Sequence, residues 1–371
     1  MLKKFSVSNF KIFNSEITFD LTSSNGYTFN PECIKNGVVN SSMIYGHNAC
    51  GKSNLGLAIF DIIEHLTDKF RIVSKYQNYL NASSTEDTAK FSYELLINGI
   101  IIKYEYEKAD YKTLVSERFW IDGKELICFD RKNGNSTFTA KLKGAETLNT
   151  EITDSSLSVL KYIKNNSVLA QNNENNAFLA FYSFVEQMLF FRSLEDRIYI
   201  GHEIEKSSLV SDIIRQNKVQ EFEDFLNEAN VKCKLAVVDT INGQNIAFDF
   251  GAKKILINDV MSTGTSSMML FFCWYMQVID SKVSFVFIDE FDAFYHHELS
   301  KLIVKKLMQT GIQFVVTTHN TSLMSNDLMR PDCYYLMGNN KIKPLSCCTE
   351  KELRYVHNIE KIYKGGGFYV G

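Results

Sequence analysis

The chain has 371 residues, of which 45% are hydrophobic and 22% charged, an ordinary composition for a globular protein with a large core. Lysine and arginine number 40 against 43 aspartate and glutamate, so the net charge is −3 and no overall positive field indicates nucleic-acid binding. The longest purely apolar run, Met268–Met276, is well short of the roughly 20 residues of a spanning helix, and the N-terminal residues turn polar too early for a secretion signal. We therefore expect neither a secreted nor an integral membrane protein.

The eight cysteines are scattered along the chain without a CxxC pair or zinc-site spacing. This usage is typical of reduced thiols, so we expect a cytoplasmic protein without a zinc site.

The first 45 residues predict β-structure. Leu2–Phe10 and Ile17–Leu21 alternate apolar and polar residues, and Val38–Tyr45 predicts a third strand that leads into a glycine loop. Lys52–Leu66 then predicts a helix, because its apolar residues recur at helical spacing on one face.

The next segments predict an antiparallel meander. Asn98-Gly99 and Asp122-Gly123 are strong hairpin signals between alternating runs. The predicted strands are Phe91–Ile97, Ile100–Tyr106, Leu114–Ile121 and Glu125–Asp130. From about 155 to 228 the pattern turns helical, and we expect the asparagine-rich stretch 165–176 to be a solvated loop.

The last third of the chain predicts alternating strands and helices. Strands are expected over Cys233–Val238, Ile246–Phe250, Lys254–Ile257, Val283–Ile288 and Ile312–Thr317, and helices over Met268–Asp280 and Ala293–Met308. A buried strand, a helix and a second buried strand in succession favour a parallel sheet covered by helices, and thus the α/β class.

A phosphate-binding loop is the strongest motif. Residues 46–53 read Gly-His-Asn-Ala-Cys-Gly-Lys-Ser, which fits G-x-x-x-x-G-K-[ST] between a predicted strand and a predicted helix. Backbone N–H groups of such a loop point at phosphate oxygens, and the helix N-terminus adds its dipole. Lys52 would reach the β- and γ-phosphates, and Ser53 would ligate Mg²⁺. The candidate nucleotide-binding residues here are Gly46, Gly51, Lys52, Ser53 and Asn54.

Two adjacent acids follow the apolar strand at Val283–Ile288. Alternation along an extended strand end would send Asp289 and Glu290 in different directions, so Asp289 could face the Mg²⁺ shell and Glu290 an attacking water. The alternative interpretation is a pair of acids that only terminates a buried strand.

Two further features accompany these acids. Ser262, Gly264 and Thr265 belong to a turn of small residues that opens an apolar helix, where the alternative is ordinary N-capping. His319 follows a buried strand, at the edge where parallel sheets bind ligands, where the alternative is a structural histidine.

The order and spacing of these motifs resemble the ABC-type P-loop ATPase head shared by SMC, RecF and related proteins. Asn9-Phe10-Lys11 resembles the N-terminal start of that group. Within it, the runs 288–299 and 358–368 resemble the OLD-family and abortive-infection defence ATPases. The resemblance implies a mixed central sheet with an antiparallel β meander and a helical inserted lobe.

The resemblance also implies roles for individual residues. Two heads would enclose two ATP molecules, with Ser262, Gly264 and Thr265 of one head contacting the γ-phosphate bound by the other. Glu290 would be the general base and His319 the γ-phosphate sensor. Asp292 would lie in a loop that couples the two sites, and Asn48 would lie close to the phosphates. No Q-loop glutamine is assigned, and we expect an ATPase head without the acidic nuclease domain of full-length OLD proteins.

The motifs suggest a discontinuous domain organisation. We expect an ATPase core over 1–90 and 231–345, an inserted meander and helical lobe over 91–230, and a C-terminal helix and tail over 346–371.

Three functions are consistent with these motifs. The first is an ATP- and Mg²⁺-dependent dimeric switch that controls a partner effector, a nuclease or toxin, in antiphage defence. The second is a RecF-like DNA-repair or DNA-maintenance ATPase that binds DNA or RNA directly. The third is a nucleotide-dependent scaffold with little turnover. The near-neutral charge favours a protein partner, and no membrane is expected.

Overall fold

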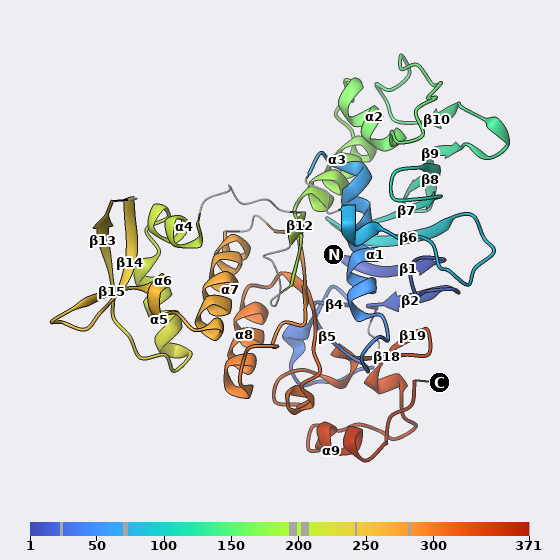
Figure 1. The fold of residues 1–371 in the computed structure, drawn as a ribbon. Helices are drawn as coiled ribbons and strands as arrows, with labels where there is room; N and C mark the ends of the chain where they lie inside the picture. The colour runs from blue at the N-terminus through green and yellow to red at the C-terminus, as the bar shows by residue number, and fades with distance from the viewer. Residues whose placement is uncertain are drawn as a thin grey trace.

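Two seven-stranded sheets form the body of the protein in the computed structural model (Figure 1). The structure describes residues 1–22, 25–69, 73–192, 199–201, 208–241, 243–280 and 283–370. The helical segment expected over 155–228 includes 193–198 and 202–207, which lie outside the described residues. No helix in the described part of the chain is long and apolar enough to cross a membrane.

The first sheet is antiparallel, in the order β10-β9-β8-β7-β6-β1-β2. Its strands are β1 (Leu2–Ser8), β2 (Ile17–Asp20), β6 (Ala89–Ile97), β7 (Ile100–Lys108), β8 (Leu114–Ile121), β9 (Lys124–Asp130) and β10 (Phe138–Ala140). The meander is confirmed, and Asn98, Gly99, Asp122 and Gly123 all have positive φ, as tight hairpin turns require. β6 pairs with β1, so the meander continues the N-terminal sheet, and the expected boundary at residue 90 falls inside β6.

The second sheet has a parallel centre, in the order β12-β11-β16-β17-β5-β18-β19. Its strands are β5 (Ser41–Tyr45), β11 (Met188–Arg192), β12 (Tyr199–Gly201), β16 (Phe285–Asp289), β17 (Gln313–Thr317), β18 (Tyr334–Gly338) and β19 (Lys341–Pro344). Strands β11, β16, β17, β5 and β18 run parallel, and the two edge strands run antiparallel. This arrangement confirms the α/β class and a mixed sheet.

Two predictions about the strands of the parallel sheet were wrong. β11 lies in a segment expected to be helical, because periodicity does not separate a short apolar run in a strand from one in a helix. The single strand expected over Val38–Tyr45 is divided into β4 (Val38–Val39), which pairs with β3 (Ile34–Lys35), and β5 of the parallel sheet.

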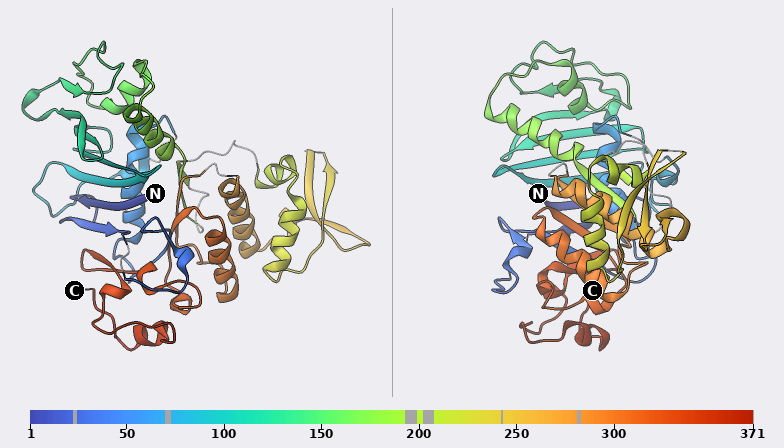
Figure 2. Two further views of the ribbon diagram at one scale, coloured as in Figure 1. Left: turned by 180° about the vertical axis from the view of Figure 1, so that it is seen from behind. Right: turned by 90° about the vertical axis from the view of Figure 1, so that its left-hand side faces the viewer.

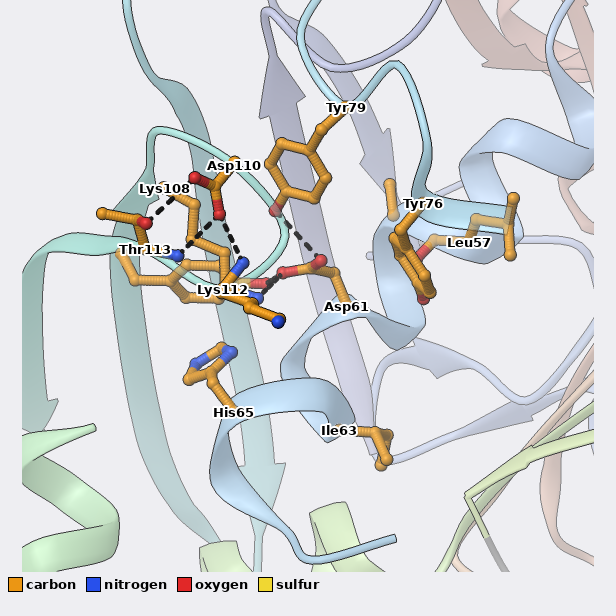
Figure 3. A network of polar contacts seen from close by, with 12 residues as sticks. Leu57, Asp61, Ile63, His65, Tyr76, Tyr79, Lys108, Asp110, Lys112 and Thr113 are labelled. Atoms are coloured by element: carbon orange, nitrogen blue, oxygen red, sulfur yellow. Dashed lines mark hydrogen bonds and ion pairs between the residues drawn. The ribbon is translucent and has the colours of Figure 1, made fainter. Parts of the chain in front are cut away.

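Helix α1 (Lys52–Leu66) lies between the two sheets. Ring atoms of Phe190 and Phe287 on the parallel sheet lie 2.7 Å from where a Cβ on Gly56 would be. On the other side, the Tyr93 hydroxyl of β6 donates to the Ala58 carbonyl at 3.0 Å. Thirteen of its 15 residues are buried, so α1 is covered all round rather than on one face, and its polar residues need buried partners (Figure 3).

Helices α7 (Thr263–Ile279) and α8 (His297–Gln309) cover the opposite face of the parallel sheet. The Phe191 ring stacks on Trp274 of α7 at 5.7 Å between centroids, whereas the neighbouring Phe190 packs on Phe60 of α1. Consecutive strand residues point to opposite faces, so α1 and α7 lie on opposite sides of the sheet. α8 begins at His297, and the expected helical residues 293–296 lie outside it: 293 and 294 form part of a turn, and His296 caps the helix.

The remaining elements cover the sheets or project from them. Helices α2 (Val159–Asn166) and α3 (Asn173–Glu186) follow the meander, and the Asn172 side chain caps α3, so the asparagine-rich stretch is only partly a loop. A smaller lobe extends beside α7 (Figure 2), and α9 (Ile359–Lys364) lies near the C-terminus. The lobe contains α4 (Leu209–Arg215), α5 (Val219–Glu228), β13 (Leu235–Thr240), β14 (Gly243–Asp249), β15 (Lys254–Leu256) and α6 (Ile257–Val260).

Candidate functional site

The glycine loop joins the end of β5 to the start of α1. Ala49 and Gly51 have φ values of 61° and 107°, so the chain turns sharply before the helix. A Cβ at Gly51 would lie 2.6 Å from Cδ1 of Ile12, which packs over the loop and was not identified from the sequence. Gly51 is also the N-cap of α1, and no side chain of the described residues caps this end. The first-turn N–H groups are therefore available to phosphate oxygens.

The Lys52 side chain folds back onto this loop. The residue is 6% exposed, and Nζ donates to the carbonyls of Gly46 and His47 at 2.8 and 3.2 Å. An ammonium held by two neutral carbonyls can exchange them for phosphate oxygens with a gain in charge pairing. Ser53 and Asn54 follow in the first helical turn and are half-buried, and Asn48 is exposed on the loop.

The two predicted acids lie at the carboxyl end of β16. Asp289 is 1% exposed, and its Oδ1 accepts a hydrogen bond from the Thr317 hydroxyl at 2.7 Å. Glu290 leaves the strand with φ of 50°, so a left-handed turn, rather than strand alternation, sets its direction. The two carboxylates do not diverge completely, because both contact the guanidinium of Arg192.

Arg192 is a site residue that the sequence interpretation missed. It ends β11, is paired in register with Asp289, and carries Nε 3.3 Å from Asp289 Oδ2 and an Nη 3.0 Å from Glu290 Oε2. The available signal was an apolar run that ends in arginine, but it has meaning only when β11 is recognised as the neighbour of β16. The cation balances two carboxylates that would otherwise repel each other at the sheet edge.

His319 lies just beyond β17, on the same edge of the sheet. Burial lowers the pKa of His319, and the nearby Lys52 ammonium lowers it further, whereas Glu290, Asp292 and Asp289 act in the opposite direction. These interactions show that the imidazole lies within electrostatic range of both the glycine loop and the acids. The lowered pKa favours a neutral ring near pH 7.

Thr318 connects the histidine segment to the turn after β16. Its Oγ1 lies 2.8 Å from both carboxylate oxygens of Asp292, and it accepts the N–H of Asn320 at 2.9 Å. Burial raises the pKa of Asp292, while the bond from Thr318 acts against that rise. The turn that contains Asp292 and the segment that contains His319 are therefore joined directly.

Among the described residues, no hydrogen bond or ion pair joins Ser262, Gly264 or Thr265 of the predicted signature turn to this cluster. Ser262 caps α7, with Oγ accepting the N–H of Thr265 at 3.2 Å, so the capping alternative is satisfied. At Gly264 a Cβ would lie 3.7 Å from its nearest neighbour, the Phe294 carbonyl, which is an ordinary contact. Packing of the described chain therefore does not require glycine at this position. The turn opens α7, on the opposite face of the sheet from α1.

The sheet topology explains which residues meet. β16, β17 and β5 are adjacent and parallel, so their carboxyl ends bring together the acids, the histidine segment and the glycine loop. This edge fits a nucleotide with Mg²⁺: Asp289 Oδ2 is buried and has no hydrogen-bond partner among the described residues, although Arg192 pairs with it ionically. Mg²⁺ typically takes one or two protein ligands beside phosphate and water, which Ser53 and Asp289 could supply.

Comparison with solved structures finds similar folds among SMC heads. An SMC head bound to the C-winged-helix domain of ScpA has 12% identity and a TM-score of 0.49, covering 92% of this chain and 96% of that chain. The SMC head domain from Thermotoga maritima has 15% identity and a TM-score of 0.45, with coverages of 92% and 98%. An Smc head with an extended coiled coil, bound to the C-terminal domain of ScpA from Pyrococcus furiosus, has 12% identity, a TM-score of 0.43 and coverages of 92% and 95%.

No curated protein matches this chain in a sequence comparison. A family model does match, over residues 41–325, which include the glycine loop, the two acids and the histidine. The chain therefore belongs to the P-loop ATPase family described as "AAA domain, putative AbiEii toxin, Type IV TA system".

Proposed function

We propose that the protein binds and hydrolyses ATP at the edge formed by β5, β16 and β17. The observation that carries this proposal is the convergence of Lys52, Asp289, Glu290 and His319, which come from three separate parts of the sequence. A glycine loop alone would support phosphate binding. The added pair of acids and the histidine supply what hydrolysis needs beyond binding.

Each side chain has a distinct task in this proposal. The uncapped N-terminus of α1 and Lys52 bind the β- and γ-phosphates. Ser53 and Asp289 would hold Mg²⁺, which neutralises developing charge on the phosphates when bound. Glu290 accepts a proton from the attacking water, and a neutral His319 contacts the γ-phosphate.

The active unit we propose is a dimer of this chain. α1 and α7 lie on opposite faces of the sheet, and among the described residues the side chains of Ser262 and Thr265 hydrogen-bond within their own turn rather than to the glycine loop. A second copy could place its α7 N-terminus against the nucleotide. The small side chains there, with a Gly264 that its own chain does not require, support such a close approach.

The hydrolysis proposal is tested by steady-state release of phosphate from purified protein. Lys52→Ala and Glu290→Gln should each abolish turnover, and Glu290→Gln should still bind ATP. Lys124→Ala, which removes an exposed lysine of the meander, serves as the matched control and should keep the wild-type rate. Unchanged turnover in both site variants would refute the assignment.

The dimer is tested in two ways. Glu290→Gln with ATP and Mg²⁺ should elute as a dimer in size exclusion with light scattering, and a persistent monomer would refute the model. Mixing Lys52→Ala with Gly264→Asp protein should restore part of the activity, because one composite site then combines an intact loop with an intact turn.

We further propose that the dimer is a switch for a partner effector, a nuclease or toxin, in antiphage defence, in the manner of OLD-family and abortive-infection ATPases. The family description, which names a putative toxin of a toxin–antitoxin system, and the net charge of −3 support this over direct DNA binding. Four lysines in and beside the meander support it too, because each of these four is paired with a carboxylate: Lys90 with Glu86, Lys103 with Glu105, Lys124 with Glu174 and Lys132 with Glu107.

The switch is tested by affinity capture from the native host. Tagged Glu290→Gln protein with ATP should recover a nuclease or toxin that wild-type protein with ADP does not. Recovery of nucleic acid without such a protein would favour the alternative, a RecF-like ATPase that acts on DNA.

A further inference from the structure

Thr317, the last residue of β17, is completely buried and belongs to none of the recognised motifs. The two residues before it are valines, and a third valine would suit a buried strand equally well. A hydroxyl in such a position carries a desolvation cost unless it is hydrogen-bonded. The partners of this hydroxyl therefore show what it does.

The Thr317 hydroxyl both donates and accepts a hydrogen bond at the end of the neighbouring strand β16. Oγ1 donates its proton to Asp289 Oδ1 at 2.7 Å and accepts the backbone N–H of Glu290 at 2.8 Å. The Thr317 carbonyl accepts the N–H of Phe291 at 3.1 Å. One residue thus holds three consecutive residues at the point where β16 ends.

The bonds to the backbone support an unfavourable conformation. Glu290 has φ of 50°, in the left-handed region that residues with a Cβ seldom occupy. Such a conformation persists only where surrounding contacts determine it. Thr317 accepts the N–H of Glu290 itself and the N–H of Phe291, which flank the Glu290 Cα, so these two bonds hold the turn that directs the Glu290 side chain.

The hydrogen bond from Thr317 to Asp289 fixes the orientation of the Asp289 carboxylate. With Oδ1 engaged by Thr317, Oδ2 is the oxygen that remains without a hydrogen bond among the described residues, although it is paired ionically with Arg192. A buried carboxylate that is oriented in this way presents one oxygen in a set direction. Outer contacts of this kind hold metal ligands in place and tune metal affinity.

We propose that Thr317 is a positioning residue that orients both acids of the site, Asp289 toward the divalent cation and Glu290 toward the attacking water. This inference rests on the proposed ATPase site but concerns a residue outside its motifs. Thr317 touches neither nucleotide nor cation in this proposal, and it acts only through the two acids.

The test compares Thr317→Val, which removes the hydroxyl at nearly constant volume, with Thr317→Ser, which keeps it. Mn²⁺ replaces Mg²⁺ so that binding can be followed by electron paramagnetic resonance with a non-hydrolysable ATP analogue, independently of turnover. We expect Thr317→Val to weaken Mn²⁺ binding by about 10- to 100-fold and to lower kcat with little change in the KM for ATP. Thr317→Ser should keep most of the wild-type Mn²⁺ affinity and most of the wild-type kcat.

Thr67→Val is the matched control, because it also removes a buried threonine hydroxyl, one that donates to the Ile63 carbonyl at 2.8 Å at the far end of α1. It should leave Mn²⁺ affinity unchanged, and thermal unfolding should show that every variant is folded.

Wild-type Mn²⁺ affinity in Thr317→Val would overturn the proposal, as would a Thr317→Ser protein as weak as Thr317→Val. Wild-type protein that binds Mn²⁺ and nucleotide without hydrolysing ATP would refute the proposed hydrolysis, and the Mn²⁺ affinities would still decide the role of Thr317. Wild-type protein that binds no Mn²⁺ with the nucleotide would overturn both.

Discussion

The ion pair between Asp61 of α1 and Lys108 of β7 offers a sharp test of how the helix is held between the sheets (Figure 3). Both side chains are 0% exposed, and Lys108 Nζ lies 2.7 Å from Asp61 Oδ2. The hydroxyls of Tyr79 and Tyr106 each donate to the same carboxylate at 2.9 Å. The pair is thus fully desolvated and is embedded in further hydrogen bonds.

Replacing Lys108 with Met keeps most of the volume of the lysine stem and removes only the charge. The Asp61 carboxylate would then be buried with two tyrosine hydroxyls and no countercharge. Breaking a buried pair on one side costs about 3–5 kcal/mol, and we expect Lys108→Met to lower the free energy of unfolding by that amount. Asp61→Asn combined with Lys108→Met should regain much of the loss, because no buried charge remains.

Urea unfolding followed by circular dichroism measures the effect as a shift of the midpoint at similar m-value. Lys124→Met is the control, because Lys124 and Glu174 form an exposed pair, with side chains 60% and 38% exposed. Removing this exposed pair should cost no more than about 1 kcal/mol. A Lys108→Met protein as stable as the control, or a double variant as unstable as Lys108→Met, would show that the buried pair does not hold α1 in place.

Three further predictions concern stability, each measured by the same unfolding assay. Burial raises the pKa of Glu117 above its ordinary value of 4.5, so the folded protein keeps a proton that the unfolded chain releases, and stability should fall as pH rises above that value. Glu117→Gln should remove this contribution, and an unchanged pH slope would contradict it. Gln313 is buried and bonds to three backbone groups of β1 and β4 at 2.6–2.9 Å, so Gln313→Ala should cost at least about 2 kcal/mol. Gly56→Ala should cost about 1–3 kcal/mol despite better helix propensity, because its Cβ would lie 2.7 Å from two buried phenylalanine rings; a stabilised variant would mean that these rings can move.

Local sequence patterns predicted many of the helices and strands correctly. The bounds predicted for α1 agree with the structure, and the meander was recognisable because dipeptides such as Asn98-Gly99 specify tight turns. The division of Val38–Tyr45 between two sheets was not recognisable, because both halves are apolar and a change of pairing partner leaves no local pattern. β11 was missed for a different reason, because a short apolar run can form a strand or part of a helix and periodicity does not separate the two.

The sequence alone therefore identified the loop at 46–53, the acids at 289 and 290 and the histidine at 319 as candidate site residues, since each motif is contiguous in the chain. Only the tertiary structure decided what surrounds them. Arg192 reaches the acids because β11 pairs with β16, and Thr317 reaches them because β17 lies on the other side of that strand. Parallel pairing joins residues far apart in sequence, and the partners it selects depend on how whole sheets and helices pack, which no local pattern encodes.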